Sequence, residues 1–124
     1  MLVTGIDIIE IERIESVVAR WGDRFLQRIY TDQELDFCRG QISRLAARFA
    51  AKEAAVKALG TGIRGIGWTE VEVVRQKGEA PSLRLHGKAA QKAKSLGIRE
   101  LALSLSHSRD YAVASVVGWR EVPP

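Results

Sequence analysis

Cysteine is nearly absent from this sequence, since Cys38 is the only one among 124 residues. A single cysteine excludes an internal disulfide and favours a reducing compartment. The chain also lacks an apolar run long enough to cross a membrane. Its opening residues lack a basic leader, and Asp7 and Glu10 interrupt the apolar run there. We therefore expect a cytoplasmic protein that binds no membrane.

Repeats, low-complexity tracts and linkers are absent as well, which predicts one domain over residues 1–120 and a loose tail at 121–124. Acidic residues are outnumbered: 15 Asp and Glu stand against 19 Lys and Arg, and the net charge is +4. This balance favours an acidic partner, such as a nucleotide, a nucleic acid or an acidic protein. A basic surface that serves only solubility would carry the same charge.

Periodicity predicts the secondary structure. The first half should hold a strand at residues 2–9 and helices at 11–21, at 24–29, from Thr31 onward, and from an N-cap at Ser43 to Leu59. Thr31 and Glu34 form a capping box, and Gly22 and Gly60 end helices. The second half should hold strands at 70–73, 82–86, 101–105 and 111–117, with a helix at 88–96. The predicted class is α+β, with helices packed on a mainly antiparallel sheet.

Helix 43–59 carries the most informative pattern. Glu53 and Lys57 lie one turn apart, which is usually a weak surface ion pair. On the same helix Arg44, Arg48 and Lys52 follow at intervals of four, so like charges should stack along one side. An anionic ligand would offset their repulsion, whereas solvent would only screen it.

Asp7 is a lone carboxylate in an apolar strand, and with Glu53 it would suit Mg²⁺ bound to phosphate oxygens. Glu10 and Glu12 are rival ligands that the pattern does not separate from Asp7. The loop from Gly60 to Gly65 has the spacing of a dinucleotide fingerprint. It follows a helix and precedes a strand, however, so we reject that interpretation.

Arginines surround Phe25 on the first two helices, at positions 13, 20, 24 and 28. Such a set could bind an acidic helix or a nucleic acid. These segments together resemble the holo-acyl-carrier-protein synthases, the small bacterial 4'-phosphopantetheinyl transferases. The matching segments are Gly5-Ile6-Asp7 through Ile14, Arg48-Phe49-Ala50-Ala51-Lys52-Glu53-Ala54 with Lys57 and Gly60-Thr61-Gly62, and Ser104-Leu105-Ser106-His107 with Tyr111-Ala112.

The resemblance implies a phosphopantetheinyl transferase domain that moves 4'-phosphopantetheine from coenzyme A to a serine of an acyl carrier protein, releasing 3',5'-ADP. It implies Asp7 and Glu53 as Mg²⁺ ligands and Lys57 as a catalytic residue facing the pyrophosphate. Coenzyme contacts would come from Arg48, Lys57, Gly60, Thr61, Gly62, Ser106 and His107. The acidic carrier would meet Arg13, Arg20, Phe25 and Arg28.

The resemblance also implies a homotrimer whose active sites lie between neighbouring subunits, with His107 acting on the Asp7 and Glu53 of the adjacent one. The sequence departs from the family at Gly78-Glu79-Ala80-Pro81, where Gly-Lys-Pro is usual. Whether the carrier serves fatty-acid or polyketide synthesis stays open, as do the choice between Mg²⁺ and Mn²⁺ and the general base. The competing interpretation is a non-catalytic basic module that binds nucleic acid or an acidic protein. It gives Asp7 and Glu53 no role, so we expect the transferase and no nucleic-acid partner.

Overall fold

The computed structural model describes residues 1–60, 65–76 and 78–121. The elements are β1 (Leu2–Glu10), α1 (Ile11–Trp21), α2 (Asp23–Ile29), α3 (Asp32–Cys38), α4 (Ile42–Ala58), the short 3₁₀ turn η1 (Trp68–Glu70), β2 (Val71–Val74), β3 (Ser82–Leu85), α5 (Gly87–Ser95), β4 (Ile98–His107) and β5 (Tyr111–Arg120). Within these ranges, no helix combines the length and apolarity needed to cross a membrane.

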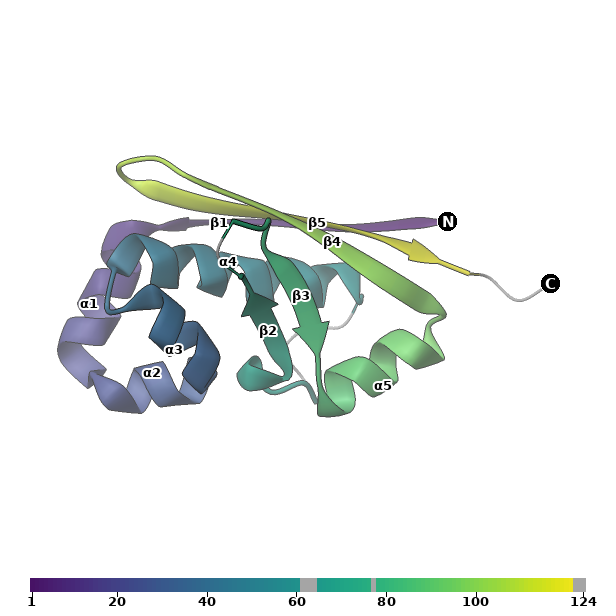
Figure 1. Cartoon of the computed structure of the whole chain (residues 1–124), viewed down its shortest axis with the longest axis horizontal. Coiled ribbons are helices and arrows are strands. Elements are labelled where there is room, and N and C mark those ends of the chain that lie inside the picture. Colours follow the sequence, from purple (N-terminus) through teal and green to yellow (C-terminus); the bar gives the residue numbers. More distant parts are fainter. Residues whose placement is uncertain (61–64, 77, 122–124) are drawn as a thin grey trace.

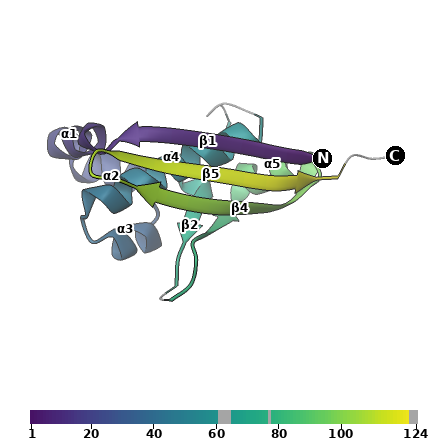
Figure 2. The same ribbon diagram turned by 90° about the horizontal axis from the view of Figure 1, so that it is seen from above.

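Helix α4 packs against one face of a three-stranded antiparallel sheet in the order β1-β5-β4 (Figure 1). Strand β5 pairs with both neighbours, with Leu2 opposite Trp119 on one side and Leu105 opposite Ala114 on the other. Strands β1 and β4 are therefore the two edges of this sheet (Figure 2). Helices α1 to α3 gather at one end of the molecule, and the β2–β3 hairpin and α5 lie toward the other (Figure 1).

Small residues allow α4 to lie close to the sheet. Ala50 and Ala54 of α4 are completely buried, as are Ala112 and Ala114 of β5. On β1, a Cβ atom at Gly5 would overlap the backbone oxygen of Ala54, so only glycine permits this approach. The close contact fixes β1 against the helix that carries Glu53 and Lys57.

A buried ion pair joins α4 to α3 and to the hairpin. The Nζ atom of Lys52 donates to Oε1 of Glu34 at 2.7 Å and to the carbonyl oxygens of Val71 at 2.6 Å and Trp68 at 3.1 Å. Both charged side chains are fully buried. The predicted like-charge stack on α4 is therefore wrong at Lys52, because three acceptors hold its ammonium group inside the protein.

The fold confirms the α+β class and most predicted elements, and the capping box between Thr31 and Glu34 is present. The predicted N-cap at Ser43 is wrong. Arg39 and Gly40 adopt positive φ angles of 48° and 73°, so the chain reverses early and the helix begins at Ile42, after an N-cap at Gln41. Residues 122–124 lie outside the described ranges, so the division at residue 120 stays a prediction.

Candidate active site

Two acidic side chains from distant parts of the chain line one cavity. This carboxylate cavity has a volume of about 290 Å³, and Asp7 of β1 and Glu53 of α4 line it with Lys57, Arg13 and Phe25. Residues on β1 alternate, so Asp7 faces the helix side of the sheet with the buried Gly5 and Ile9. Glu53 and Lys57 reach the same cavity because residues four apart share a helix face.

The rival carboxylates lie elsewhere. Glu10 and Glu12 line a separate cavity with Glu15 and Asp110, where the hairpin between β4 and β5 meets the start of α1. Of the three acidic candidates in the first strand and helix, only Asp7 lines the cavity that holds Glu53. Asp7 is therefore the one of these three candidates that shares a cavity with Glu53.

Lys57 pairs with Asp7 across two elements. Its Nζ atom lies 3.1 Å from Oδ1 of Asp7 and donates to the carbonyl oxygen of Ile6 at 3.0 Å. Burial raises the pKa of Glu53 and the nearby Asp7 raises it further, while Lys57 opposes both effects. The cavity therefore concentrates negative charge that a cation would stabilise.

The donor set fits a hard divalent cation. Mg²⁺ takes oxygen ligands and is usually bound by one or two carboxylates, with water and substrate phosphates completing its shell. Among the residues that the structure describes, no group of three or more His, Cys, Asp or Glu side chains could hold a metal. Asp7 and Glu53 would thus provide two ligands, and the remaining positions would be open to a substrate.

A second cavity, the arginine cavity, has a volume of about 630 Å³ and gathers positive charge on the other side of α4. Arg44 and Arg48 line it from α4, Arg75 lines it from beyond β2, and Ser106 and His107 line it from the end of β4. The described lining residues include no carboxylate. This arrangement favours an anion with more than one negative charge.

Three guanidinium groups surround one aromatic ring at this second cavity. Their central carbons lie 4.3 Å (Arg48), 5.0 Å (Arg44) and 5.8 Å (Arg75) from the ring centroid of Phe37. Cation–π contacts of this kind stabilise each charge by about 0.5–2 kcal/mol. The ring thus holds together like charges that would otherwise repel.

Arg48 is incompletely satisfied. Only 3% of its surface is exposed, its Nη1 donates to the carbonyl oxygen of Arg44 at 3.3 Å, and its Nε and Nη2 atoms have no partner in the described structure. Burial lowers the pKa of Arg48, and Arg75 and Arg44 lower it further, while Cys38 and Glu34 oppose this shift. Buried donors without acceptors are costly and point to a ligand.

Three of the four predicted carrier-binding residues, Arg13, Phe25 and Arg28, line two adjoining cavities. Phe25 and Val17 line both the carboxylate cavity and a neighbouring one of about 500 Å³, which Trp21, Arg24 and Arg28 complete. Arg13 lies in the carboxylate cavity. Arg20 lines neither cavity, and its guanidinium group lies 5.1 Å from the ring centroid of Trp21, which lines the neighbouring one.

Some predicted residues are not placed. Thr61 and Gly62 lie outside the described residues, and Gly60, with a φ angle of 75°, is the last residue before that gap. Sequence reasoning missed Phe37 and Arg75 as candidates for the site. Arg75 directly follows the alternating residues of β2, which is the only sequence signal near it. Nothing in the sequence shows that the chain brings Arg75 close to Phe37 of α3.

Comparison with known proteins identifies the family to which this chain is similar over nearly its whole length. The 4'-phosphopantetheinyl transferase superfamily matches residues 4–116 of this chain. A relative from Herpetosiphon aurantiacus, named holo-[acyl-carrier-protein] synthase, is 54% identical over 125 residues and covers 95% of this chain and 98% of its own.

Solved structures of holo-[acyl-carrier-protein] synthases also resemble this chain. Helicobacter pylori holo-[acyl-carrier-protein] synthase in complex with coenzyme A has a TM-score of 0.85 and 35% identity, covering 94% of this chain and 99% of its own. A coenzyme A complex of the synthase from Chronobacterium ammoniagenes has a TM-score of 0.86 and 30% identity, covering 98% and 99%.

Proposed function

Because this chain belongs to the 4'-phosphopantetheinyl transferase superfamily, we propose how its two cavities perform that family's reaction. The enzyme transfers the 4'-phosphopantetheine group of coenzyme A to a serine of apo acyl carrier protein and releases 3',5'-ADP. The observation that carries the site assignment is the carboxylate cavity, where Asp7, Glu53 and Lys57 adjoin the arginine-rich surface of α1 and α2.

Asp7 and Glu53 hold Mg²⁺ in this proposal. When bound there, the cation would neutralise the charge that develops on the pyrophosphate of coenzyme A. The serine oxygen forms a bond to the β-phosphorus, and the bond between that phosphorus and the oxygen of 3',5'-ADP breaks. Glu53 lines this cavity and would accept the serine proton. Lys57 stabilises the phosphate that leaves.

The arginine cavity binds the 3'-phosphate of coenzyme A, which is the phosphate outside the pyrophosphate. Arg48, Ser106 and His107 were expected there from the family, and Arg44 and Arg75 add two further guanidinium groups. Arg75 stands in the hairpin that lacks the usual lysine, so it supplies positive charge from the same segment. Gly60, Thr61 and Gly62 remain proposed coenzyme contacts on the strength of the family resemblance.

The acidic carrier docks on α1 and α2. Arg13, Arg20 and Arg28 would contact its carboxylates, and Phe25 would pack against its apolar side chains. Phe25 lines both the docking surface and the carboxylate cavity, so a serine carried to this surface would reach Asp7 and Glu53.

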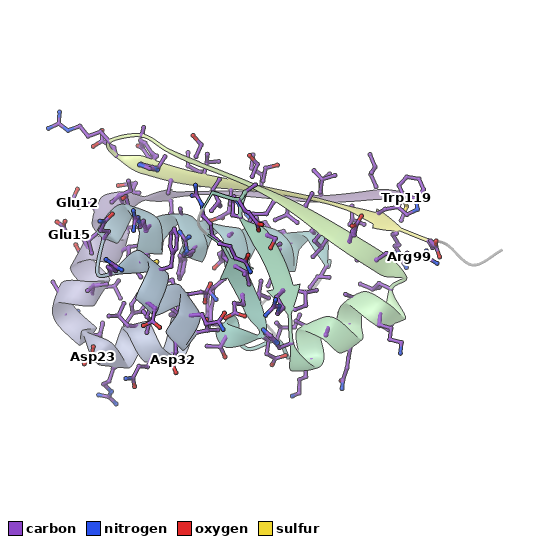
Figure 3. All side chains as sticks on the ribbon, viewed as in Figure 1. Glu12, Glu15, Asp23, Asp32, Arg99 and Trp119 are labelled. Carbon is purple, nitrogen blue, oxygen red and sulfur yellow. The ribbon has the colours of Figure 1, made fainter. Side chains whose placement is uncertain are left out.

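A homotrimer would bring the two cavities together. They lie at opposite edges of the main sheet, since the carboxylate cavity adjoins β1 and the arginine cavity adjoins β4. The outer face of that sheet is apolar, with Ile6 and Ile8 63% and 64% exposed. In the described part of the chain no helix covers this face (Figure 2), and Trp119 lies on it (Figure 3). Such a face favours burial against another subunit, and a cyclic arrangement joins one edge to the opposite edge of the neighbour.

The test is intact mass spectrometry of an apo acyl carrier protein incubated with the enzyme, coenzyme A and Mg²⁺. We expect one phosphopantetheine to be added, and we expect EDTA to prevent the addition. Transfer that continues undiminished in EDTA would remove the metal from the proposal. The alternative binding module would show no transfer and would instead bind nucleic acid in a salt-sensitive way. The cytoplasmic location stays a prediction.

A further inference from the structure

We propose that Lys57 competes with the divalent cation for Asp7, so that the cation binds tightly only together with the coenzyme. This inference rests on the proposed function, because it concerns the same two carboxylates. It assigns Lys57 a role before the reaction, in addition to its contact with the pyrophosphate. Binding of the cation and of coenzyme A would then be coupled through one side chain.

The geometry places the ammonium group of Lys57 where the cation would bind. Nζ lies 3.1 Å from Oδ1 of Asp7 and 3.0 Å from the carbonyl oxygen of Ile6, so two of its three donors are used on β1. A cation bound to Oδ1 would lie close to this ammonium group, and the two positive charges would repel each other. Lys57 and a divalent cation are therefore alternatives at this atom.

Lys57 is also the partner that can leave. Its side chain is 54% exposed, whereas that of Asp7 is 18% exposed. Asp7 stands on a strand held against α4 by the close approach at Gly5. A long, half-exposed lysine changes rotamer at little cost, so the ammonium group can move while the carboxylate stays in place.

Without the coenzyme the cation has few favourable contacts. Asp7 and Glu53 are the two carboxylates among the described residues that line the cavity, and Lys57 lines it with them and pairs with Asp7 at 3.1 Å. Two carboxylates already partly neutralised by a lysine make a weak cation site. The free enzyme should therefore bind a divalent cation poorly.

The phosphates of coenzyme A would favour cation binding in two ways. They supply oxygen ligands to the cation, and they offer Lys57 an anionic partner that draws Nζ away from Oδ1. Each ligand should therefore strengthen binding of the other by the same factor, as thermodynamic linkage requires. Substrate phosphates thus complete the site that Lys57 leaves incomplete.

The experiment measures Mn²⁺ binding by electron paramagnetic resonance, without carrier protein, so that no transfer occurs. Wild-type enzyme, Lys57→Met and Lys57→Arg are titrated alone and with saturating coenzyme A, after correction for Mn²⁺ bound by free coenzyme. We expect Lys57→Met alone to bind Mn²⁺ roughly tenfold more tightly than wild type, from the charge removed beside Asp7. Lys57→Arg should resemble wild type, and Lys88→Met, an exposed position on α5, should change nothing.

Coenzyme A should strengthen Mn²⁺ binding to the wild type strongly and to Lys57→Met much less. Unchanged or weaker Mn²⁺ binding by Lys57→Met alone would overturn the competition. Failure of the proposed metal site gives a different result, in which wild type and Glu53→Gln bind Mn²⁺ equally in the presence of coenzyme A. Transfer to the carrier, followed separately by mass, reports on the function itself.

Discussion

Arg48 and Glu53 lie five residues apart on α4 and line two different cavities. Five residues turn a helix by about 140° beyond a full turn, which separates the two side chains onto different faces. Each is costly to the folded chain, since Arg48 is buried with two unpartnered nitrogen atoms and burial raises the pKa of Glu53. Charged groups whose burial is only partly compensated within their own chain are expected at functional sites.

Arg48→Met should separate stability from substrate binding. The variant removes a buried charge whose Nε and Nη2 atoms have no acceptor, while keeping most of the side-chain volume. We expect the free energy of unfolding to stay the same or to rise by up to roughly 2 kcal/mol. The KM for coenzyme A should rise strongly. Denaturant unfolding and steady-state kinetics check this, and a loss of stability would mean that Arg48 is a structural residue.

Arg75→Ala tests the part of the arginine cavity that the family did not suggest. Arg75 is exposed and lies 5.8 Å from the ring centroid of Phe37, so its loss should leave the fold intact. We expect a higher KM for coenzyme A and a smaller change in kcat, because the side chain binds a group remote from the reacting phosphorus. Arg84→Ala, at an exposed position on β3, is the matched control. Equal kinetics for the two variants would remove Arg75 from the site.

Glu53→Gln should stabilise the enzyme at neutral pH while abolishing transfer. The folded-state pKa of Glu53 is raised, so ionisation costs the folded state more than the unfolded chain. That cost is absent below the ordinary pKa of about 4.3 and grows as the pH rises toward the folded-state pKa. In buffer without divalent cations, the melting temperature of the variant should therefore exceed that of wild type at pH 7. The two should converge below about pH 4, and a difference that persists there would refute the electrostatic cause.

Lys52→Met should be strongly destabilising, in contrast to Arg48→Met. It leaves the carboxylate of Glu34 buried without its cation, which costs about 3–5 kcal/mol. The double variant Lys52→Met with Glu34→Gln should recover part of that loss, because no buried charge remains. A double-mutant cycle from denaturant unfolding measures the coupling. Additive losses would show that the two side chains do not act as a pair.

The sequence predicted local structure well where local rules decide it. The capping box at Thr31 and Glu34 and the helix end at Gly22 involve residues a few positions apart, and both are present. Glu34 also shows the limit, since its carboxylate accepts from Lys52 and from the backbone of Val73 across the fold. Spacing on α4 therefore suggested a charged stack at Lys52, although that side chain is in the core.

The sequence predicted most residues of the candidate site, but it did not predict that they line two separate cavities. Asp7 and Glu53 came from lone carboxylates and family resemblance, and the structure brings them to one cavity. Phe37 and Arg75 meet through the return of the β2–β3 hairpin, a tertiary contact with no periodic signal. Lys57 was predicted beside Glu53 by helical spacing, whereas its ion pair is with Asp7, 50 positions away in sequence.

In the proposed trimer, the carboxylate cavity of one subunit works with the arginine cavity of its neighbour. Glu53→Gln and Arg48→Met impair different cavities, so the two variants are co-expressed with different tags and the mixed assembly is isolated through both. In a cyclic trimer one interface of three would be intact, and holo carrier measured by intact mass should form at about a third of the wild-type rate. At a coenzyme A concentration well below the raised KM of Arg48→Met, each variant alone should transfer little or no phosphopantetheine. A mixed assembly no more active than the single variants would contradict the account.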